Sequence, residues 1–151
     1  MSWKPSSVAN PPNKMRTLIL IPTETEAALL RAACPDAPVR IAGVGMAAAA
    51  AATARIIAEE HPDRLILAGI AGASDRSVAV CEVGAVAGER IAELPGKYAV
   101  RYAADFIPAG LRTVESNTTN RTGVAASGTQ IENMEGAAFL AVCRAFGVPG
   151  A

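Results

Sequence analysis

The feature that most constrains the fold is a strand–helix–strand pattern in the first half of the chain. Val39 to Val44 is a short apolar run bounded by glycines, and the residues from Met46 to Glu60 are nearly all good helix formers. His61-Pro62 stops that helix, and a second apolar run follows from Arg64 to Ala68. Strands and helices that alternate at these lengths form βαβ units, which imply a parallel sheet with helices on its faces.

Further elements are predicted on either side of this unit. Thr17 to Ile21 is a short apolar run that we interpret as a buried strand. Pro22 ends it, and Thr23 can cap a helix that extends to about Ala33. Val83 to Ile91 is a further strand candidate. The first of these strands and its helix continue the alternation of strands and helices.

The second half of the chain is less regular. Thr122 to Ala126 is a strand candidate, and the polar second half of the segment from Leu94 to Arg121 is interpreted as a loop. The last helix, which Gly147 is placed to end, carries one small-residue face at helical spacing. That face comprises Met134, Ala137, Ala138, Ala141, Val142 and Ala145. A chain of this kind normally enters another strand after Val148-Pro149, but the sequence ends at Ala151. We therefore expect an α/β fold of three layers, αβα, that is incomplete at its C-terminus.

The totals exclude several classes of partner. Lys and Arg together number 14, as do Asp and Glu, so no electrostatic reason exists to expect nucleic acid or an anionic membrane. No apolar run approaches the ~20 residues that span a bilayer. Residues 1–16 are polar and contain proline, and we predict a disordered leader there, with one domain over 17–151. The three cysteines match neither a disulfide framework nor a zinc pattern, which favours a soluble cytoplasmic protein without a metal.

Two acidic segments could supply the chemistry of a site. Thr23-Glu24-Thr25-Glu26 follows a strand, and ligands of parallel α/β folds bind at the carboxyl ends of strands, where a carboxylate could activate water. In Glu132-Asn133-Met134-Glu135, the methionine could pack on the apolar face of a sugar and the last carboxylate could accept hydrogen bonds from two hydroxyls. Both segments also fit a simpler explanation, because acidic residues favour helix N-termini whatever their function.

Two glycine-rich turns follow neighbouring strands. Gly43-Val44-Gly45-Met46-Ala47-Ala48 matches the dinucleotide-binding pattern G-x-G-x-x-A. That pattern needs an acidic residue at the end of the next strand to hold a ribose, and Gly69-Ile70-Ala71-Gly72 stands there instead. Each turn could serve packing alone, but together they leave room for a ligand to approach bare backbone. His61 is the only histidine, which argues against a Ser/His or Cys/His nucleophile system.

The ordered set of these motifs resembles the nucleoside phosphorylase and nucleosidase superfamily, and most of all futalosine hydrolase. The motifs are Thr-Glu-Thr-Glu, Gly-Val-Gly-Met, Ala-Gly-Ile-Ala-Gly-Ala and Glu-Asn-Met-Glu-Gly-Ala-Ala, and the resemblance covers residues 17–95 and 123–149. It implies the family's central sheet, no cofactor, a homo-oligomer and hydrolysis of the N-glycosidic bond of a purine nucleoside. The substrate it favours is futalosine, cleaved to hypoxanthine and dehypoxanthine futalosine in menaquinone biosynthesis. The family continues after Val-Pro with an R-x-x-S-[DN] segment, and this sequence ends before it.

The resemblance also implies roles for individual positions. Glu26 corresponds to the carboxylate that positions the hydrolytic water, and Glu135 to the one that binds the ribose 2′- and 3′-hydroxyls. Met134 corresponds to the methionine that packs on the sugar, and Val44 to a residue that lines the ribose and water site. Ala71 and Gly72 correspond to backbone beside the base.

Three functions are weighed on this basis. A phosphorylase would require a basic phosphate clamp, which is not evident in the sequence, so hydrolysis is favoured. The alternatives to futalosine hydrolysis are methylthioadenosine/S-adenosylhomocysteine nucleosidase activity and a non-catalytic remnant that binds a nucleoside. Binding of NAD through the Gly43–Ala48 turn is a distant fourth.

Overall fold

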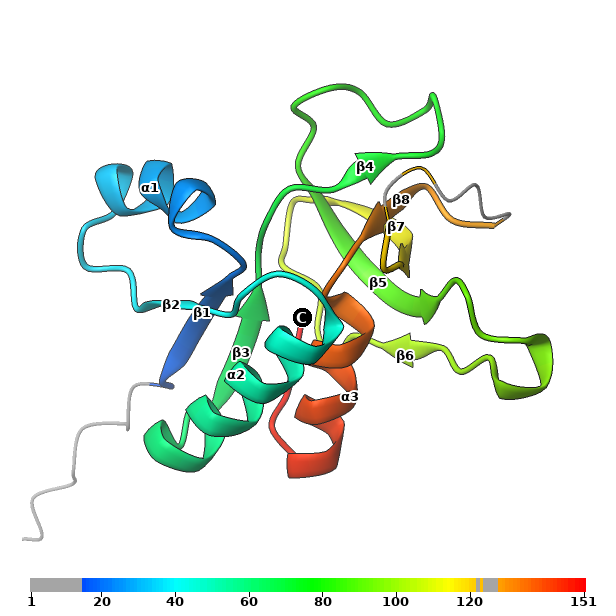
Figure 1. Cartoon of the computed structure of the whole chain (residues 1–151). Helices are drawn as coiled ribbons and strands as arrows, with labels where there is room; N and C mark the ends of the chain where they lie inside the picture. The colour runs from blue at the N-terminus through cyan, green and yellow to red at the C-terminus, as the bar shows by residue number, and fades with distance from the viewer. Residues whose placement is uncertain (1–14, 122, 124–127) are drawn as a thin grey trace, which may run out of the picture.

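The structure is a computed structural model that describes residues 15–121, 123 and 128–151 (Figure 1). Its elements follow one another in the order β1 (Thr17–Ile21), α1 (Glu24–Ala33), β2 (Val39–Ile41), α2 (Met46–Glu60), β3 (Arg64–Leu67), β4 (Gly72–Ala73), β5 (Gly84–Ile91), the 3-10 helix η1 (Gly96–Tyr98), β6 (Tyr102–Ala103), β7 (Arg112–Thr118), β8 (Ile131–Asn133) and α3 (Gly136–Phe146). The strand predicted over Thr122–Ala126 lies almost wholly outside the described residues.

The first half of the chain forms the predicted parallel sheet. Its strand order is β2-β1-β3, and β1 is parallel to both neighbours, with Ile19 opposite Val39 and Ile66. The strand expected to reach Val44 ends earlier, at Ile41, because Gly43 has a φ of +80° and turns the backbone. The βαβ prediction is confirmed, with this shorter second strand.

A second sheet contains the largest departure from the sequence analysis. Its order is β4-β8-β7-β5-β6, and β7 and β8 lie within the stretches that we interpreted as a loop and a helix start. The loop prediction for the second half of 94–121 was wrong, because β7 is a central strand whose polar side chains are buried with partners. Asn117 Nδ2 donates to Thr129 Oγ1 at 2.6 Å, and Thr118 Oγ1 donates to Glu89 at 3.0 Å. Polar composition therefore did not indicate exposure in this segment.

The helices cover both faces of the β2-β1-β3 sheet, as Figure 1 shows. One face packs Ile21 and Val39 against Ala27 of α1. The other packs Leu18, Leu20 and Leu65 against α2 and α3, in one buried cluster with Ile56 and Phe139. Alternate residues of β1 thus serve opposite layers, as the period of a strand requires. The predicted three-layer α/β fold is confirmed.

The buried face of α3 overlaps the predicted face only in part: Ala137 is buried and Val142 packs against the core, as predicted. Phe139, Leu140 and Cys143 are buried, whereas Ala145 is exposed. The prediction followed the small residues, but the larger side chains take the positions between the sheet and α2, because they remove more apolar area from water. Gly147 ends the helix at a φ of +68°, as predicted.

The two ends of the described chain are both fastened to the first sheet. Gly150 pairs in parallel with Leu65, so the chain enters a strand position directly after α3. The predicted leader, residues 1–16, lies outside the described residues except for Met15 and Arg16. The Arg16 backbone N–H donates to Asp63 Oδ2 at 2.6 Å, so the polar contacts of the sheet begin before residue 17.

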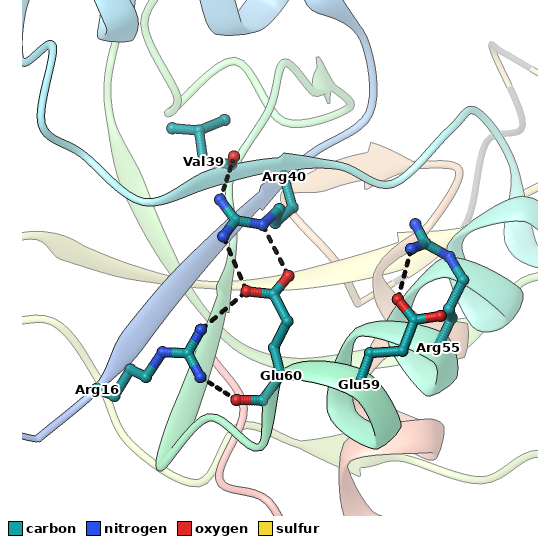
Figure 2. A network of polar contacts seen from close by, with 6 residues as sticks. All are labelled: Arg16, Val39, Arg40, Arg55, Glu59 and Glu60. Carbon is teal, nitrogen blue, oxygen red and sulfur yellow. Dashed lines mark hydrogen bonds and ion pairs between the residues drawn. The ribbon is translucent and has the colours of Figure 1, made fainter.

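A network of charged side chains joins three elements at the amino end of β1 (Figure 2). Glu60, the last residue of α2, receives a two-pronged contact from Arg40 of β2, with Nε at 2.7 Å and Nη2 at 2.8 Å. Arg16, just before β1, donates to the same carboxylate at 2.9 Å and to the Glu60 carbonyl oxygen. These contacts hold the end of α2 against the sheet at the edge opposite to the turns that follow β1 and β2. None of the helices in the described ranges is long and apolar enough to cross a membrane.

Candidate functional site

A cleft of about 570 Å³ lies where β1, β2 and β3 end and α3 begins. This is the edge at which ligands bind in parallel α/β sheets, and the volume falls within the range of small-molecule sites. The six residues singled out from the sequence all line it. The full lining is Pro22, Thr23, Thr25, Glu26, Val44, Ile70, Ala71, Gly72, Thr119, Glu132, Asn133, Met134 and Glu135.

The Glu26 carboxylate is held by groups from two strand ends. Thr23 is the N-cap of α1: its hydroxyl accepts from the Glu26 N–H at 3.2 Å and donates to Glu26 Oε2 at 2.7 Å. The Ile70 N–H, in the segment after β3, donates to Glu26 Oε1 at 3.0 Å. A carboxylate oxygen accepts more than one hydrogen bond, so both oxygens keep capacity for a water molecule.

Gly69 allows this arrangement by having no side chain. A Cβ at this position would lie 3.1 Å from Glu26 Oε1 and 3.1 Å from Pro22 Cδ. The segment after β3 therefore passes close enough to α1 for its backbone to bind the carboxylate. The glycine that ended the predicted strand thus has a structural explanation, namely close approach of the two segments.

Glu135 is held by backbone N–H groups and is nearly enclosed. Only 6% of its surface is exposed. Its Oε1 accepts from the Gly45 N–H at 2.7 Å, and its Oε2 accepts from the Met134 N–H at 3.2 Å. Hydrogen bonds from backbone groups stabilise an ionised carboxylate, and they fix where its free lone pairs point.

The turn after β2 directs the Gly45 N–H at that carboxylate. Gly45 has φ +88° and ψ +163°, a combination that only glycine adopts without strain. This turn is the one that matched the dinucleotide pattern. Because its N–H already binds Glu135, a pyrophosphate at this place would face a carboxylate, and the dinucleotide interpretation loses its physical basis.

Behind the cleft lies a buried carboxyl group that we did not single out from the sequence. Glu89 of β5 is 2% exposed; Asn133 Nδ2 donates to its Oε1 at 2.6 Å and Thr118 Oγ1 to its Oε2 at 3.0 Å. Burial raises the pKa of Glu89 to about 7, although the hydrogen bonds from Asn133 and Thr118 act in the opposite direction. The signal was present in the sequence as an acidic residue inside a predicted strand whose other residues, apart from Arg90, are apolar or glycine.

Other lining residues also escaped the sequence analysis as site candidates. Glu132 lies directly opposite Gly72 in the β4–β8 pair, and a Cβ on that glycine would come within 3.1 Å of Glu132 Cγ. Thr119 follows β7, the strand that we had interpreted as a loop. Without that strand, the position of Thr119 at the cleft could not be predicted. In the described part of the chain, no group of three or more His, Cys, Asp or Glu side chains is arranged to hold a metal ion.

Comparison with known proteins gives a likeness in structure. No family model matches the sequence, and neither does any curated protein. Among solved structures, the 5′-methylthioadenosine/S-adenosylhomocysteine nucleosidase of Neisseria meningitidis, in complex with methylthio-immucillin-A, matches at a TM-score of 0.75 and 19% identity, over 90% of this chain and 83% of that chain. A mutant futalosine hydrolase of Helicobacter pylori matches at 0.78 and 12%, over 90% and 82%.

The chain has the fold of these nucleosidases. A third neighbour, the methylthioadenosine/S-adenosylhomocysteine nucleosidase of Campylobacter jejuni, matches at a TM-score of 0.76 and 14% identity, over 90% of this chain and 82% of that chain. Identities this low establish the fold alone. Evidence for a function must therefore come from the side chains around the cleft.

Proposed function

We propose that the protein hydrolyses the N-glycosidic bond of a purine nucleoside in this cleft. One observation carries the proposal: two carboxylates from segments far apart in the sequence, Glu26 and Glu135, line the same cleft and are each held by backbone N–H groups. Cleavage of a glycosidic bond passes through a sugar with oxocarbenium character, and carboxylates near the ring stabilise that charge.

The proposed reaction assigns a different task to each carboxylate. Glu26 accepts a proton from a water molecule as the water oxygen bonds to C1′ of the ribose. The bond from C1′ to the purine nitrogen breaks and its electron pair leaves with the base, which takes up one proton from solvent. Glu26 then returns the proton of the water molecule to solvent. Glu135 accepts hydrogen bonds from the 2′- and 3′-hydroxyls and so fixes the ring, while Met134 packs on the sugar.

The remaining cleft residues complete the proposed substrate site. Val44 lines the ribose and water region, and Ala71 and Gly72 lie beside the base, where the lack of a bulky side chain leaves the backbone open to a flat ring. The motif set favours futalosine, which would yield hypoxanthine and dehypoxanthine futalosine in menaquinone biosynthesis. Methylthioadenosine or S-adenosylhomocysteine is the second candidate, supported by the Neisseria neighbour with its bound methylthio-immucillin-A.

Release of the free base by the purified chain tests the proposal. Futalosine, methylthioadenosine and S-adenosylhomocysteine are supplied separately; hypoxanthine is measured by coupled oxidation and adenine by chromatography. We expect Glu26→Gln to lower release by about 100-fold or more, because an amide cannot accept the proton. Glu24→Gln is the matched control, since Glu24 begins the same helix but pairs with Arg31 at the surface.

The outcomes separate the candidate functions. Hypoxanthine from futalosine supports the first substrate, and adenine supports the second. Binding of a nucleoside without release of base would favour the non-catalytic alternative. If no substrate gives base above the Glu26→Gln variant, the proposed hydrolysis is wrong, and if none binds either, the non-catalytic alternative is wrong as well. We further propose that the protein is cytoplasmic and forms a homo-oligomer; sedimentation of the purified chain tests the oligomeric state, and fractionation of cells tests the location.

A further inference from the structure

Glu89 is joined to the cleft through one intermediate side chain, Asn133. The amide of Asn133 donates from Nδ2 to Glu89 Oε1 at 2.6 Å and to Ser116 Oγ at 2.8 Å. Its Oδ1 accepts from the Glu135 N–H at 2.9 Å and from the Gly136 N–H at 2.7 Å. Every polar atom of this side chain therefore has a partner, and the orientation of the amide is determined by them.

The direction of these hydrogen bonds depends on Glu89. An ionised carboxylate can only accept, so it requires the NH₂ end of Asn133 to face it. The amide oxygen must then face the first N–H groups of α3. If Asn133 turned over, its NH₂ would face those N–H groups, and two sets of donors would be left without acceptors.

A second path from Glu89 reaches the same helix start. Thr118 donates its hydroxyl proton to Glu89 and accepts from the Ala137 N–H at 2.7 Å. The close fit requires Gly136, because a Cβ there would lie 2.2 Å from Glu89 Oε1. Glu89 thus orients the acceptors for three consecutive N–H groups, those of Glu135, Gly136 and Ala137.

We propose that Glu89 is a positioning residue for ribose binding: through Asn133 and Thr118 it fixes the backbone from which the Glu135 carboxylate enters the cleft. This inference rests on the proposed function, in which Glu135 binds the ribose hydroxyls. Glu89 itself contacts no substrate, because it belongs to β5, is buried, and is not part of the cleft lining.

The test reverses the polarity of the Glu89–Asn133 contact. Asn133→Asp places a second carboxylate against Glu89, so the contact is lost. Adding Glu89→Gln restores it in the opposite direction. The new amide at position 89 can donate to the new carboxylate at position 133, whose other oxygen still accepts from α3. If each substitution only destabilised the fold, the loss of ribose binding would be larger in the double variant than in Asn133→Asp alone, instead of being reversed.

The readout is the ratio of the dissociation constants of 2′,3′-dideoxyinosine and inosine, measured by calorimetry at pH 8 and again at about pH 9.5, so that the adjacent carboxylates of Asn133→Asp do not retain a shared proton. All chains carry Glu26→Gln so that the proposed hydrolysis does not consume the ligand. We expect inosine to bind on the order of 10-fold tighter or more, since hydrogen bonds to a charged group are among the stronger ones. Asn133→Asp should remove most of that preference, and Asn133→Asp with Glu89→Gln should return it to within about threefold.

Controls and contrary outcomes are defined for each chain. Glu82→Gln removes a carboxylate just before β5 whose partner is Arg112, and it should leave the ratio unchanged. Thermal melting checks folding; if Asn133→Asp does not fold, Glu89→Asp, which withdraws the carboxylate by one methylene, should lower the ratio instead. A double variant as weak as Asn133→Asp, or a Glu89→Asp chain like the parent, would overturn the inference alone. A parent without the preference would overturn the ribose contact of the proposed function, and the inference with it.

Discussion

Single residues determine the position and orientation of the Glu26 and Glu135 carboxylates in the cleft. Glycines contribute to this as much as the acidic residues do. Glu26 is positioned by its own helix cap together with the Ile70 N–H, whereas Glu135 depends on a turn in another part of the chain. Gly45 provides that turn at φ +88°, where a residue with a Cβ is strained. The carboxylate most enclosed in the cleft thus depends on a backbone conformation that one methyl group would disturb.

Gly45→Ala tests this dependence. We expect it to lower the free energy of unfolding by about 1–3 kcal/mol and to weaken nucleoside binding, because the relaxed backbone no longer directs its N–H at Glu135. Denaturant titration and the Michaelis constant for the nucleoside measure the two effects. Gly96→Ala is the control, since neither glycine has an atom within 4 Å of an added Cβ and Gly96 has no positive φ. Equal effects of the two substitutions would show that backbone strain is not the cause.

The segments of the candidate site could be found from the sequence because they lie at the ends of predicted strands or in the first turns of predicted helices, and the resemblance to the nucleosidase superfamily then selected the six positions. Topology alone brings such positions to one edge of a parallel sheet, and the structure has all six around one cleft. Glu89 could not be found in this way. Its contact with Asn133 joins β5 to β8, which lie on either side of β7, and the local sequence pattern does not show that these strands share a sheet.

At the scale of elements, the strands of the first sheet can be predicted from the local sequence pattern, whereas a central strand of the second sheet cannot. β1 and β3 are apolar runs of the buried-parallel kind, and periodicity finds them. β7 has the sequence Arg-Thr-Val-Glu-Ser-Asn-Thr, which resembles a loop in composition. Its buried polar groups are satisfied by side chains such as Glu89 and Thr129, and that compensation is invisible until the chain is folded.

The end of α2 offers a test of ion pairing between elements (Figure 2). The Arg40 guanidinium, which binds Glu60 through two hydrogen bonds, lowers the pKa of that carboxyl. A carboxyl group whose pKa is lower in the folded chain stabilises the fold at any pH above its pKa in the unfolded chain. That contribution is lost as the pH falls through its pKa in the folded chain. We expect Glu60→Gln to cost about 1 kcal/mol at neutral pH and to cost less in acid, measured by denaturant unfolding.

Glu59→Gln is the matched control for this pair. Glu59 stands in the same last turn of α2, so the helix dipole acts alike on both, but its partner is the exposed Arg55 one turn earlier. Its replacement should change the free energy of unfolding by less than about 0.5 kcal/mol. If the two variants lose equal stability, the link to β2 and Arg16 contributes nothing beyond the charge of the helix end.

For the whole molecule, the buried Glu89 predicts how stability varies with pH. Its pKa is about 7 in the folded chain against 4.5 for the ordinary group, so the folded state holds a proton that the unfolded state has released. The associated stability is complete below about pH 4.5 and is lost as the pH rises through 7. Charged Glu115 on the next strand adds to the effect, although burial is the larger cause.

Glu89→Gln removes that proton equilibrium. Relative to the parent, the variant should gain about 3 kcal/mol in free energy of unfolding between pH 4.5 and pH 8, whatever its constant offset from altered hydrogen bonding. Denaturant unfolding at several pH values measures the difference curve. Parallel curves for the two chains would mean that Glu89 has the same proton affinity in both states.

The distance along the chain between Gly45 and Glu135, 90 residues, has a consequence for how the protein is made. The Thr23–Glu26 contact spans three residues and can form as soon as α1 leaves the ribosome. The second carboxylate reaches its partner only after nearly the whole chain has been synthesised and α3 has docked on the sheet. In a nascent or partly unfolded chain, the contact between Thr23 and Glu26 can therefore exist before the Glu135 carboxylate has met the Gly45 N–H.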